Sequence, residues 1–349
     1  MQSALNQQTR PRPTVPVGSA LITLDRVSKQ FGDNVAVSDV SWQVQPGEIF
    51  GIVGPSGCGK TTAVRMMTGV YVPTSGTVEV LGRVPSQFRA SDREHIGYIP
   101  QLFVLYPNLT VLENMRFAAS MYGLIWGKRM KRINELLDFV ELNEARKTLA
   151  GNISGGMQRR LQLAAALVHN PELLFADEPT AGIDPVLRGR FWDQFKLLKA
   201  EGRAMVVTTQ YVGEVAYCDH VAVMRKGKLL LVDTPEGLRR QALGGDVISL
   251  RVDVEDTINA YRLLDQHPLV ENVKIEDRRT GKLAVYVKQA GAALPEIIKA
   301  LSEDVTIDMR HVEEYKPPFD DIFITLMEQA DKAQADAEQA HAEGVQSNA

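Results

Sequence analysis

The hydrophobic positions between Ala20 and about Gly245 alternate between short apolar runs and longer stretches with helical periodicity. This alternation is typical of an α/β domain. Four of the runs are almost continuously apolar, which favours parallel strands buried on both faces of a sheet. The predicted strands are Leu21–Val27, Val37–Val44, Ile49–Val53, Ile96–Ile99, Leu173–Ala176 and Met205–Thr208. From Asn108 to about Arg160 the pattern is helical, so we expect a helical subdomain at about 108–165.

The pattern changes after Gly244-Gly245, which we interpret as a domain boundary. The following segments predict strand, helix, strand, strand, helix and strand, the order of a ferredoxin-like sandwich. They are Val247–Val254, Thr257–Gln266, Val270–Asp277, Leu283–Lys288, Leu294–Ser302 and Val305–Val312. A last helix is expected from Asp320 to about Gln329. The sequence thus predicts one domain over 20–244 and a smaller accessory domain over 245–327.

Both ends of the chain have compositions that favour disorder. Residues 1–19 are polar and contain Pro11, Pro13 and Pro16. Residues 328–349 are rich in Ala, Gln and Glu; disorder is the favoured interpretation and a frayed helix is the alternative. This tail has five acidic residues and one lysine, a charge of −4 that equals the net charge of the whole chain. The folded body is therefore nearly neutral, which does not favour a nucleic-acid partner.

Several features predict a protein of the cytosol. The stretch from His95 to Leu112 has no formally charged residue, but it contains prolines and polar residues and does not resemble a membrane helix. The N-terminus has no apolar segment of the signal-peptide kind. The two cysteines, Cys58 and Cys218, are too few for a disulfide scaffold.

The segment Gly54–Thr61 matches the pattern G-x-x-x-x-G-K-[ST] in full. It follows the predicted strand Ile49–Val53 and opens a predicted helix, which is the context that a phosphate-binding loop requires. The glycines allow backbone N–H groups to face phosphate oxygens, Lys60 reaches the β- and γ-phosphates, and the Thr61 hydroxyl can ligate Mg²⁺. A chance match in a Gly-rich loop is the alternative. Cys58 is interpreted as a small filler, with a redox role as the unsupported alternative.

Two acids end a second apolar run. Leu173–Ala176 leads directly into Asp177 and Glu178, and Pro179 follows. In a phosphate-loop protein, Asp177 would hold Mg²⁺ and Glu178 would act as general base or polarise the attacking water. A solvated turn is the alternative, but the upstream loop favours the catalytic interpretation.

Ser154-Gly155-Gly156 opens an apolar-periodic helix, Gln158–His169, shortly before the acids. Its N–H groups and the Ser154 hydroxyl can form a second anion site. Taken alone, it would be an ordinary helix cap. One chain does not need two phosphate sites for one nucleotide, whereas two chains in a head-to-tail arrangement do.

Together these motifs resemble the nucleotide-binding subunit of ABC transporters over about Leu21–Gly237. The fold that this resemblance implies is the RecA-like P-loop NTPase core with a helical subdomain. Phe31 stands where an aromatic residue would stack on adenine, and Ala181–Asp184 resembles the D-loop. Gln101 resembles the glutamine that senses Mg²⁺ and the attacking water. The implied catalytic residues are Glu178, Gln210 and Gln101, and the implied metal-binding residues are Thr61, Gln101 and Asp177. The implied nucleotide-binding residues are Phe31, Gly54, Pro55, Ser56, Gly57, Cys58, Gly59, Lys60, Thr61, Thr62, Ser154, Gly155 and Gly156.

Two positions depart from the family pattern. Met157 replaces the usual glutamine of the signature, a mild change. Gln210 stands where the switch histidine is expected. Glutamine keeps an amide donor of similar reach but cannot carry charge. We expect retained ATP hydrolysis with a weaker γ-phosphate contact. The alternative is an ATP-gated binding module with little hydrolysis.

The segments Leu109–Phe117 and Pro318–Phe323 resemble the drug and antibiotic-resistance exporters, whose partner is a separate ABC-2 type permease. The resemblance implies a homodimer on the cytoplasmic face of the membrane, bound through that permease and exporting a drug, lipid or other amphipathic compound. The segment after Gln101 would receive the permease, although Phe103 or Tyr106 taken singly could be core. The accessory domain would support dimer contacts or bind a regulator. A soluble ABC-type ATPase acting on ribosomes or DNA is the rival class.

Overall fold

The computed structural model describes residues 19–124, 126–303 and 307–346. The disorder expected for residues 1–18 therefore lies outside the described residues. The chain folds into two compact units and passes from one to the other between Val232 and Asp233. Within the described residues, no helix is both long and apolar enough to cross a membrane.

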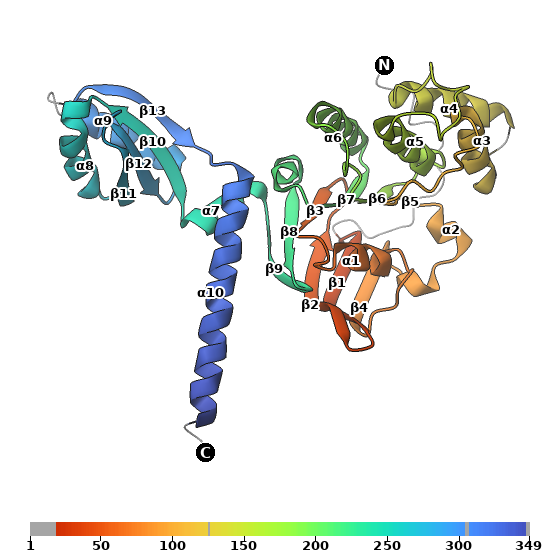
Figure 1. Cartoon of the computed structure of the whole chain (residues 1–349), viewed down its shortest axis with the longest axis horizontal. Helices are drawn as coiled ribbons and strands as arrows, with labels where there is room; N and C mark the ends of the chain where they lie inside the picture. The colour runs from red at the N-terminus through yellow and green to blue at the C-terminus, as the bar shows by residue number, and fades with distance from the viewer. Residues whose placement is uncertain (1–18, 125, 304–306, 347–349) are drawn as a thin grey trace. The chain divides into compact units, whose positions relative to one another are not determined.

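The first unit is built on a mixed sheet whose strand order is β4-β1-β2-β9-β8-β3-β7-β6-β5 (Figure 1). β3 pairs in parallel with β7 and β8, and β6 pairs in parallel with β5 and β7. β1 pairs antiparallel with β2 and β4. The strands are β1 (Ile22–Phe31), β2 (Asn34–Val44), β3 (Ile49–Val53), β4 (Ser75–Val80), β5 (Ile96–Ile99), β6 (Leu173–Asp177), β7 (Ala204–Thr209), β8 (His220–Arg225) and β9 (Lys228–Asp233).

The six strands predicted from the sequence are all present. Every residue of β3, β6 and β7 is buried, as their continuous apolar runs predict for central parallel strands. β4, β8 and β9 were not predicted. β4 lies at the edge of the sheet beside β1 and has mostly exposed residues, so its hydrophobic pattern is weak.

Helices surround this sheet, and three of them form the helical subdomain. α3, α4 and α5 pack on one another, and α5 also packs on β5. Three helix starts have side-chain caps: Thr110 accepts from the Glu113 N–H (3.2 Å), Ser154 accepts from the Met157 N–H (3.3 Å), and Asp184 accepts from the N–H groups of Val186 and Leu187 (3.0 Å each). The helices are α1 (Lys60–Met67), α2 (Ala90–Arg93), α3 (Val111–Met121), α4 (Trp126–Phe139), α5 (Gly155–Leu167) and α6 (Pro185–Ala200), with 3₁₀ helices η1 (Pro85–Gln87) and η2 (Val212–Tyr217).

The second unit contains the predicted order β-α-β-β-α-β. Its antiparallel sheet has the strand order β11-β12-β10-β13, and α8 and α9 bury one face in a separate apolar core. Its elements are α7 (Pro235–Leu243), β10 (Asp246–Val252), η3 (Val254–Asp256), α8 (Thr257–Asp265), β11 (Val270–Asp277), β12 (Lys282–Val287), α9 (Ala290–Glu303), β13 (Met309–Tyr315) and α10 (Phe319–Gln346).

The boundary between the units falls before the Gly244-Gly245 position that the sequence suggested. The reason is α7, which packs on α10 and β10 of the second unit. The Gln329 side chain donates to the Ala242 carbonyl at 3.1 Å, and the Arg239 guanidinium lies 3.8 Å from the Phe319 ring centroid. Gly244 itself ends α7 in the left-handed conformation.

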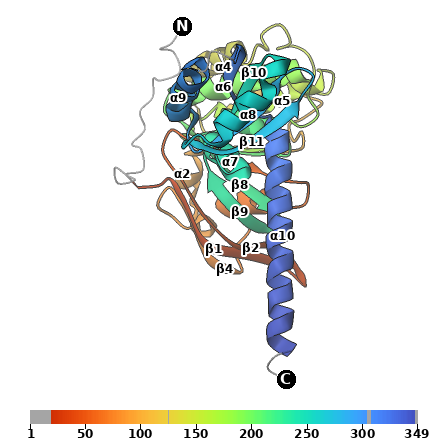
Figure 2. The same ribbon diagram turned by 90° about the vertical axis from the view of Figure 1, so that its left-hand side faces the viewer.

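The acidic tail also differs from our expectation of disorder. α10 continues as a single helix through Gln346 (Figures 1 and 2). Phe319, Ile322 and Leu326 are buried and anchor its first turns. Beyond them, alanine, glutamine and glutamate have high helix propensity and can prolong a helix that is already nucleated.

Candidate functional site

The loop Gly54–Gly59 joins β3 to α1 and leaves no room for side chains at two glycines. Gly59 has a φ of 106°, and a Cβ there would lie 2.5 Å from the Ala36 carbonyl oxygen. A Cβ on Gly54 would lie 2.2 Å from the Met224 carbonyl oxygen. Gly59 provides no side-chain cap for α1. The first N–H groups of an α-helix have no partner within the helix, so those of α1 suit an anion.

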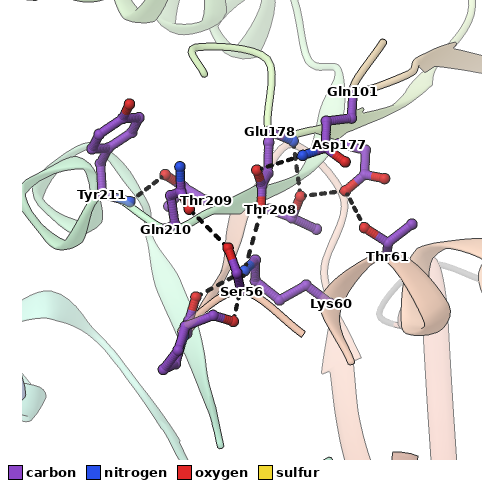
Figure 3. Close-up of polar contacts among 12 residues, drawn as sticks. Ser56, Lys60, Thr61, Gln101, Asp177, Glu178, Thr208, Thr209, Gln210 and Tyr211 are labelled. Carbon is purple, nitrogen blue, oxygen red and sulfur yellow. Dashed lines mark hydrogen bonds and ion pairs between the residues drawn. The ribbon is translucent and has the colours of Figure 1, made fainter. Parts of the chain in front are cut away.

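Lys60 is buried in this loop, with 3% of its surface exposed. Its Nζ donates to the carbonyl oxygens of Gly54 (2.8 Å) and Pro55 (3.2 Å), and it lies 3.2 Å from Glu178 Oε1. A buried ammonium needs such partners to offset its lost hydration. The loop thus holds a positive charge next to Glu178, the acid that follows β6 (Figure 3).

Asp177 ends β6 and is 1% exposed. Its Oδ1 accepts from the hydroxyls of Thr61 (3.1 Å) and Thr208 (2.7 Å). The structure therefore brings together Thr61 and Asp177, which the sequence assigned to a single metal site. Thr208, at the end of the neighbouring strand β7, is an additional partner.

Glu178 has a left-handed backbone, with φ of 48°. This conformation costs a non-glycine residue about 1–2 kcal/mol. Two hydrogen bonds from its N–H hold it, one to the Thr208 carbonyl (3.2 Å) and one to the Thr208 hydroxyl (2.9 Å). Its side chain lies between Lys60 and Gln101, whose Nε2 donates to Glu178 Oε2 at 2.9 Å. The strained turn thus aims the carboxylate at the loop.

Gln210 follows β7 and reaches the same loop from the other side. Its Oε1 accepts from the Ser56 hydroxyl at 3.1 Å (Figure 3). The position that departs from the family pattern is therefore beside the phosphate-binding loop, where an amide can act as donor or acceptor.

Cys58 is a buried residue of the loop, and Thr62 lies partly buried in α1. Burial raises the pKa of the Cys58 thiol, and the nearby Lys60 charge lowers it by less. A raised pKa leaves the thiol protonated at neutral pH, which fits the filler role.

Phe31 ends β1, with 41% of its surface exposed. It packs edge-on against Tyr71, with ring centroids 5.1 Å apart, and Lys29 Nζ lies 5.0 Å from the Phe31 centroid. An exposed aromatic ring can stack on a flat base.

The structure does not bring Ser154, Gly155 and Gly156 to the loop of the same chain. They start α5, which packs on α3, α4 and β5, apart from α1 in Figure 1. Within the part of the chain that the structure describes, no hydrogen bond joins Ser154 to Gly54–Thr61. Gly155 has open space around the position of a Cβ. A Cβ on Gly156 would instead lie 2.7 Å from the Leu187 side chain.

Sequence reasoning missed three side chains that organise the site. Arg159 donates to the Pro100 carbonyl (3.3 Å) and Gln162 donates to the Leu102 carbonyl (2.7 Å), so α5 holds the backbone on both sides of Gln101. Glu214 in η2 is a buried acid bonded to the segments after Glu178 and before Gln210. None belongs to a local motif, because each acts on residues far away in sequence.

The residues beside the loop offer oxygen donors of the kind that Mg²⁺ prefers. Among the described residues there is no group of three or more His, Cys, Asp and Glu side chains that could hold a metal ion. Mg²⁺ is usually bound by one or two carboxylates together with water and phosphate oxygens. The Asp177 carboxylate and the Thr61 hydroxyl, next to the phosphate-binding loop, supply that kind of site.

A phosphate-binding loop with its lysine, opposite a pair of acids at the end of a parallel strand of the same sheet, defines a P-loop nucleotide-binding protein. A family model described as ABC transporter matches residues 37–181. The linearmycin resistance ATP-binding protein LnrL of Bacillus subtilis (strain 168) is 32% identical over 310 residues, covering 88% of this chain and 98% of that protein. The chain belongs to the ATP-binding proteins of the ABC transporter family.

Two further similarities extend this result. The probable multidrug ABC transporter ATP-binding protein YbhF of Escherichia coli (strain K12) is 38% identical over 225 residues, which is 64% of this chain. The match covers 39% of YbhF, so the chain spans about two fifths of the length of that relative. A dimeric post-hydrolysis structure of the ATP-binding cassette MJ0796, bound to ADP and Pi, is 27% identical with a TM-score of 0.56. It covers 61% of this chain and 98% of its own.

Proposed function

We propose that this chain is an ATP-hydrolysing subunit that drives a separate membrane permease. The observation that carries the proposal is the placement of Glu178, held between Lys60 and Gln101 beside the phosphate-binding loop. A carboxylate there can accept the proton of a water molecule that attacks the γ-phosphorus. The bond to the β-phosphate then breaks, and ADP and phosphate are the products.

The loop and its neighbours supply the remaining parts. Lys60 and the N–H groups of the first turn of α1 bind the phosphates, and the exposed Phe31 ring stacks on adenine. Thr61, Gln101 and Asp177 would hold Mg²⁺, which neutralises charge on the β- and γ-phosphates when it is bound. Gln210 contacts the γ-phosphate through its amide, in place of a histidine.

Two copies of the chain form the working unit. Ser154, Gly155 and Gly156 of one copy close over the phosphate-binding loop of the other, which gives two shared sites and a two-fold dimer. The similar cassette MJ0796 is dimeric in its structure with ADP and Pi, which supports a dimer. Closure around ATP drives the permease from one facing state to the other, and hydrolysis reopens the dimer.

An exposed apolar surface next to Gln101 supports contact with a permease. Its members are large and apolar or aromatic, and they lie after Gln101 and along α3: Leu102, Val104, Tyr106, Phe117 and Met121. A cavity of about 340 Å³ adjoins them, with Val104, Leu105 and Tyr122 in its lining. Exposed apolar patches of this kind mark protein interfaces.

The relatives' names, multidrug and linearmycin resistance, favour export of a drug, lipid or other amphipathic compound through an ABC-2 type permease. The subunit would then be held at the cytoplasmic face of the membrane by that permease. The rival class, a soluble ATPase acting on ribosomes or DNA, is not favoured, because these relatives are transporter or resistance proteins.

The test is ATP hydrolysis per molecule against protein concentration, for the native chain, Glu178→Gln and Gln210→His. We expect native activity that rises with concentration and is lost in Glu178→Gln. Activity confined to Gln210→His would support instead the ATP-gated module with little hydrolysis. Activity that is retained in Glu178→Gln would remove the proposed chemistry.

A further inference from the structure

Glu214 is a buried acid with 2% of its surface exposed, and it lies outside every motif described above. It belongs to η2, the turn that follows β7 and Gln210. Its carboxylate accepts from the hydroxyls of Thr180 (2.6 Å) and Thr209 (2.5 Å), and the Arg188 Nε lies 3.4 Å away. Burying a carboxylate costs free energy unless partners compensate for its lost hydration, and these three contacts do so for Glu214.

These partners come from the two segments that flank the phosphate-binding loop. Thr180 lies two residues after Glu178, in the turn that leads to α6, and Arg188 lies in α6 itself. Thr209 is the last residue of β7, immediately before Gln210. Glu214 therefore connects the turn that follows Glu178 to the end of β7, which precedes Gln210.

The hydrogen bonds also fix the direction of the Thr209 hydroxyl. A carboxylate only accepts, so this hydroxyl donates its single proton to Glu214. Its lone pairs then accept from the Tyr211 N–H at 3.0 Å. Tyr211 is held a second time by the Arg188 guanidinium, which lies 3.8 Å from its ring centroid. The residues on both sides of Gln210 are thus held by Glu214 and its partner Arg188.

We propose that Glu214 is a positioning residue that orients Gln210 toward the γ-phosphate position and couples it to the turn after Glu178. The inference rests on the proposed function, since Gln210 has a γ-phosphate to contact only if the chain binds ATP. A glutamine at position 214 would present N–H groups to one of the two threonines. Where that amide faces Thr209, the hydroxyl accepts from both the amide and the Tyr211 N–H, and its proton loses the carboxylate acceptor, which weakens the hold on the residues beside Gln210.

The test measures the ratio of the dissociation constants for ADP and for a non-hydrolysable ATP analogue, together with kcat and KM for ATP. We expect Glu214→Gln to lower this ratio and kcat by about tenfold each, because one misplaced donor costs at least this much in a preorganised site. Binding of ADP should change less than about twofold, since Gln210 faces the third phosphate only. Thr209→Val should lower the ratio and kcat by as much, whereas Thr209→Ser, which keeps the hydroxyl, should have the native values.

A double-mutant cycle separates positioning from general destabilisation. In the Gln210→Ala background, Glu214→Gln should lower the ratio by less than about twofold, because the side chain that it orients is gone. Glu48→Gln is the matched control: Glu48 is a second buried acid, 6% exposed, that accepts from the Gln45 N–H at 2.6 Å at the start of β3. It should leave the ADP-to-ATP ratio unchanged.

Two results would overturn the role of Glu214. One is that Glu214→Gln lowers the binding ratio equally with Gln210 and with Gln210→Ala, and the other is that Glu48→Gln lowers it as much as Glu214→Gln. The binding ratio decides this even if the native chain hydrolyses little ATP. A native chain that fails to bind ATP would remove the proposed function and this inference together, whereas native binding with an unaffected Glu214→Gln would remove this inference alone.

Discussion

The side-chain amide of Gln101 donates to the Glu178 carboxylate at 2.9 Å, across 77 positions of sequence. The same carboxylate faces Lys60 at its other oxygen, so Gln101 and Lys60 together fix the direction of Glu178. Gln101 also directly precedes Leu102, the first residue of the exposed apolar surface. The contact therefore connects the proposed permease surface to the proposed general base.

Replacing Gln101 by Ala should lower kcat for ATP roughly 10- to 100-fold, because an unoriented base loses much of its advantage. ATP affinity measured without Mg²⁺ should change little, since Lys60 keeps its bonds to the Gly54 and Pro55 carbonyls. Steady-state kinetics together with equilibrium binding of an ATP analogue separate these effects. A loss of affinity without a loss of kcat would contradict this role of Gln101.

Replacing Ser154 by Arg should leave ATP binding intact and abolish hydrolysis, because in the proposed dimer Ser154 serves the site of the other copy. Ser154→Thr, which keeps the cap on α5, is the control. Mixing Ser154→Arg with Lys60→Ala should restore activity, since one site of the mixed dimer then has an intact loop and an intact signature. No recovery on mixing would argue against shared sites.

Replacing Gly59 by Ala should abolish nucleotide binding. The new Cβ would lie 2.5 Å from the Ala36 carbonyl oxygen, in addition to a backbone cost of about 1–2 kcal/mol. Gly57→Ala is the matched control: Gly57 also has a positive φ, of 78°, but open space around its Cβ position. Calorimetric titration with ADP should show a clearly smaller defect for Gly57→Ala, and equal defects would rule out the close contact as the cause.

Both cysteines should react slowly with alkylating reagents at neutral pH. Burial is the main cause that raises the pKa of Cys58 and of Cys218 above the usual value of a thiol. The thiolate is the reactive form. At a pH below the pKa, each unit by which the pKa is raised lowers the thiolate fraction about tenfold. Alkylation followed by mass spectrometry should therefore keep accelerating above about pH 9, with the denatured chain as reference. A plateau near neutral pH would contradict the raised pKa.

Replacing Gln162 by Leu should loosen the segment that begins at Pro100. The bond from Gln162 to the Leu102 carbonyl would be lost, and hydrogen–deuterium exchange of residues 100–106 should become faster. Gln194→Leu is the matched control, because Gln194 is also buried and donates to a carbonyl, that of Phe139, at 3.1 Å. Faster exchange of residues 100–106 in both variants would indicate general loosening instead.

The sequence by itself determined the central strands, the helical subdomain and the local parts of the site. A continuous apolar run indicates a strand that is buried on both faces of the sheet. The loop Gly54–Thr61 can be recognised locally, because a single turn of backbone surrounds the phosphate. The β-α-β-β-α-β order of the second unit was also predicted, because each of its elements has its own periodicity.

Only the tertiary structure decided what depends on contacts between distant segments. It assigned α7 to the second unit, since its packing on α10 and β10 leaves no mark in the local pattern. It also revealed that Arg159 and Gln162 of α5 donate hydrogen bonds to the backbone on both sides of Gln101. Glu214 is the clearest case: in sequence it is one acid in a polar turn, and only the folded chain places the Thr180 and Thr209 hydroxyls against it. The role of a buried charged residue depends on the groups that it contacts, and the tertiary structure determines which groups these are.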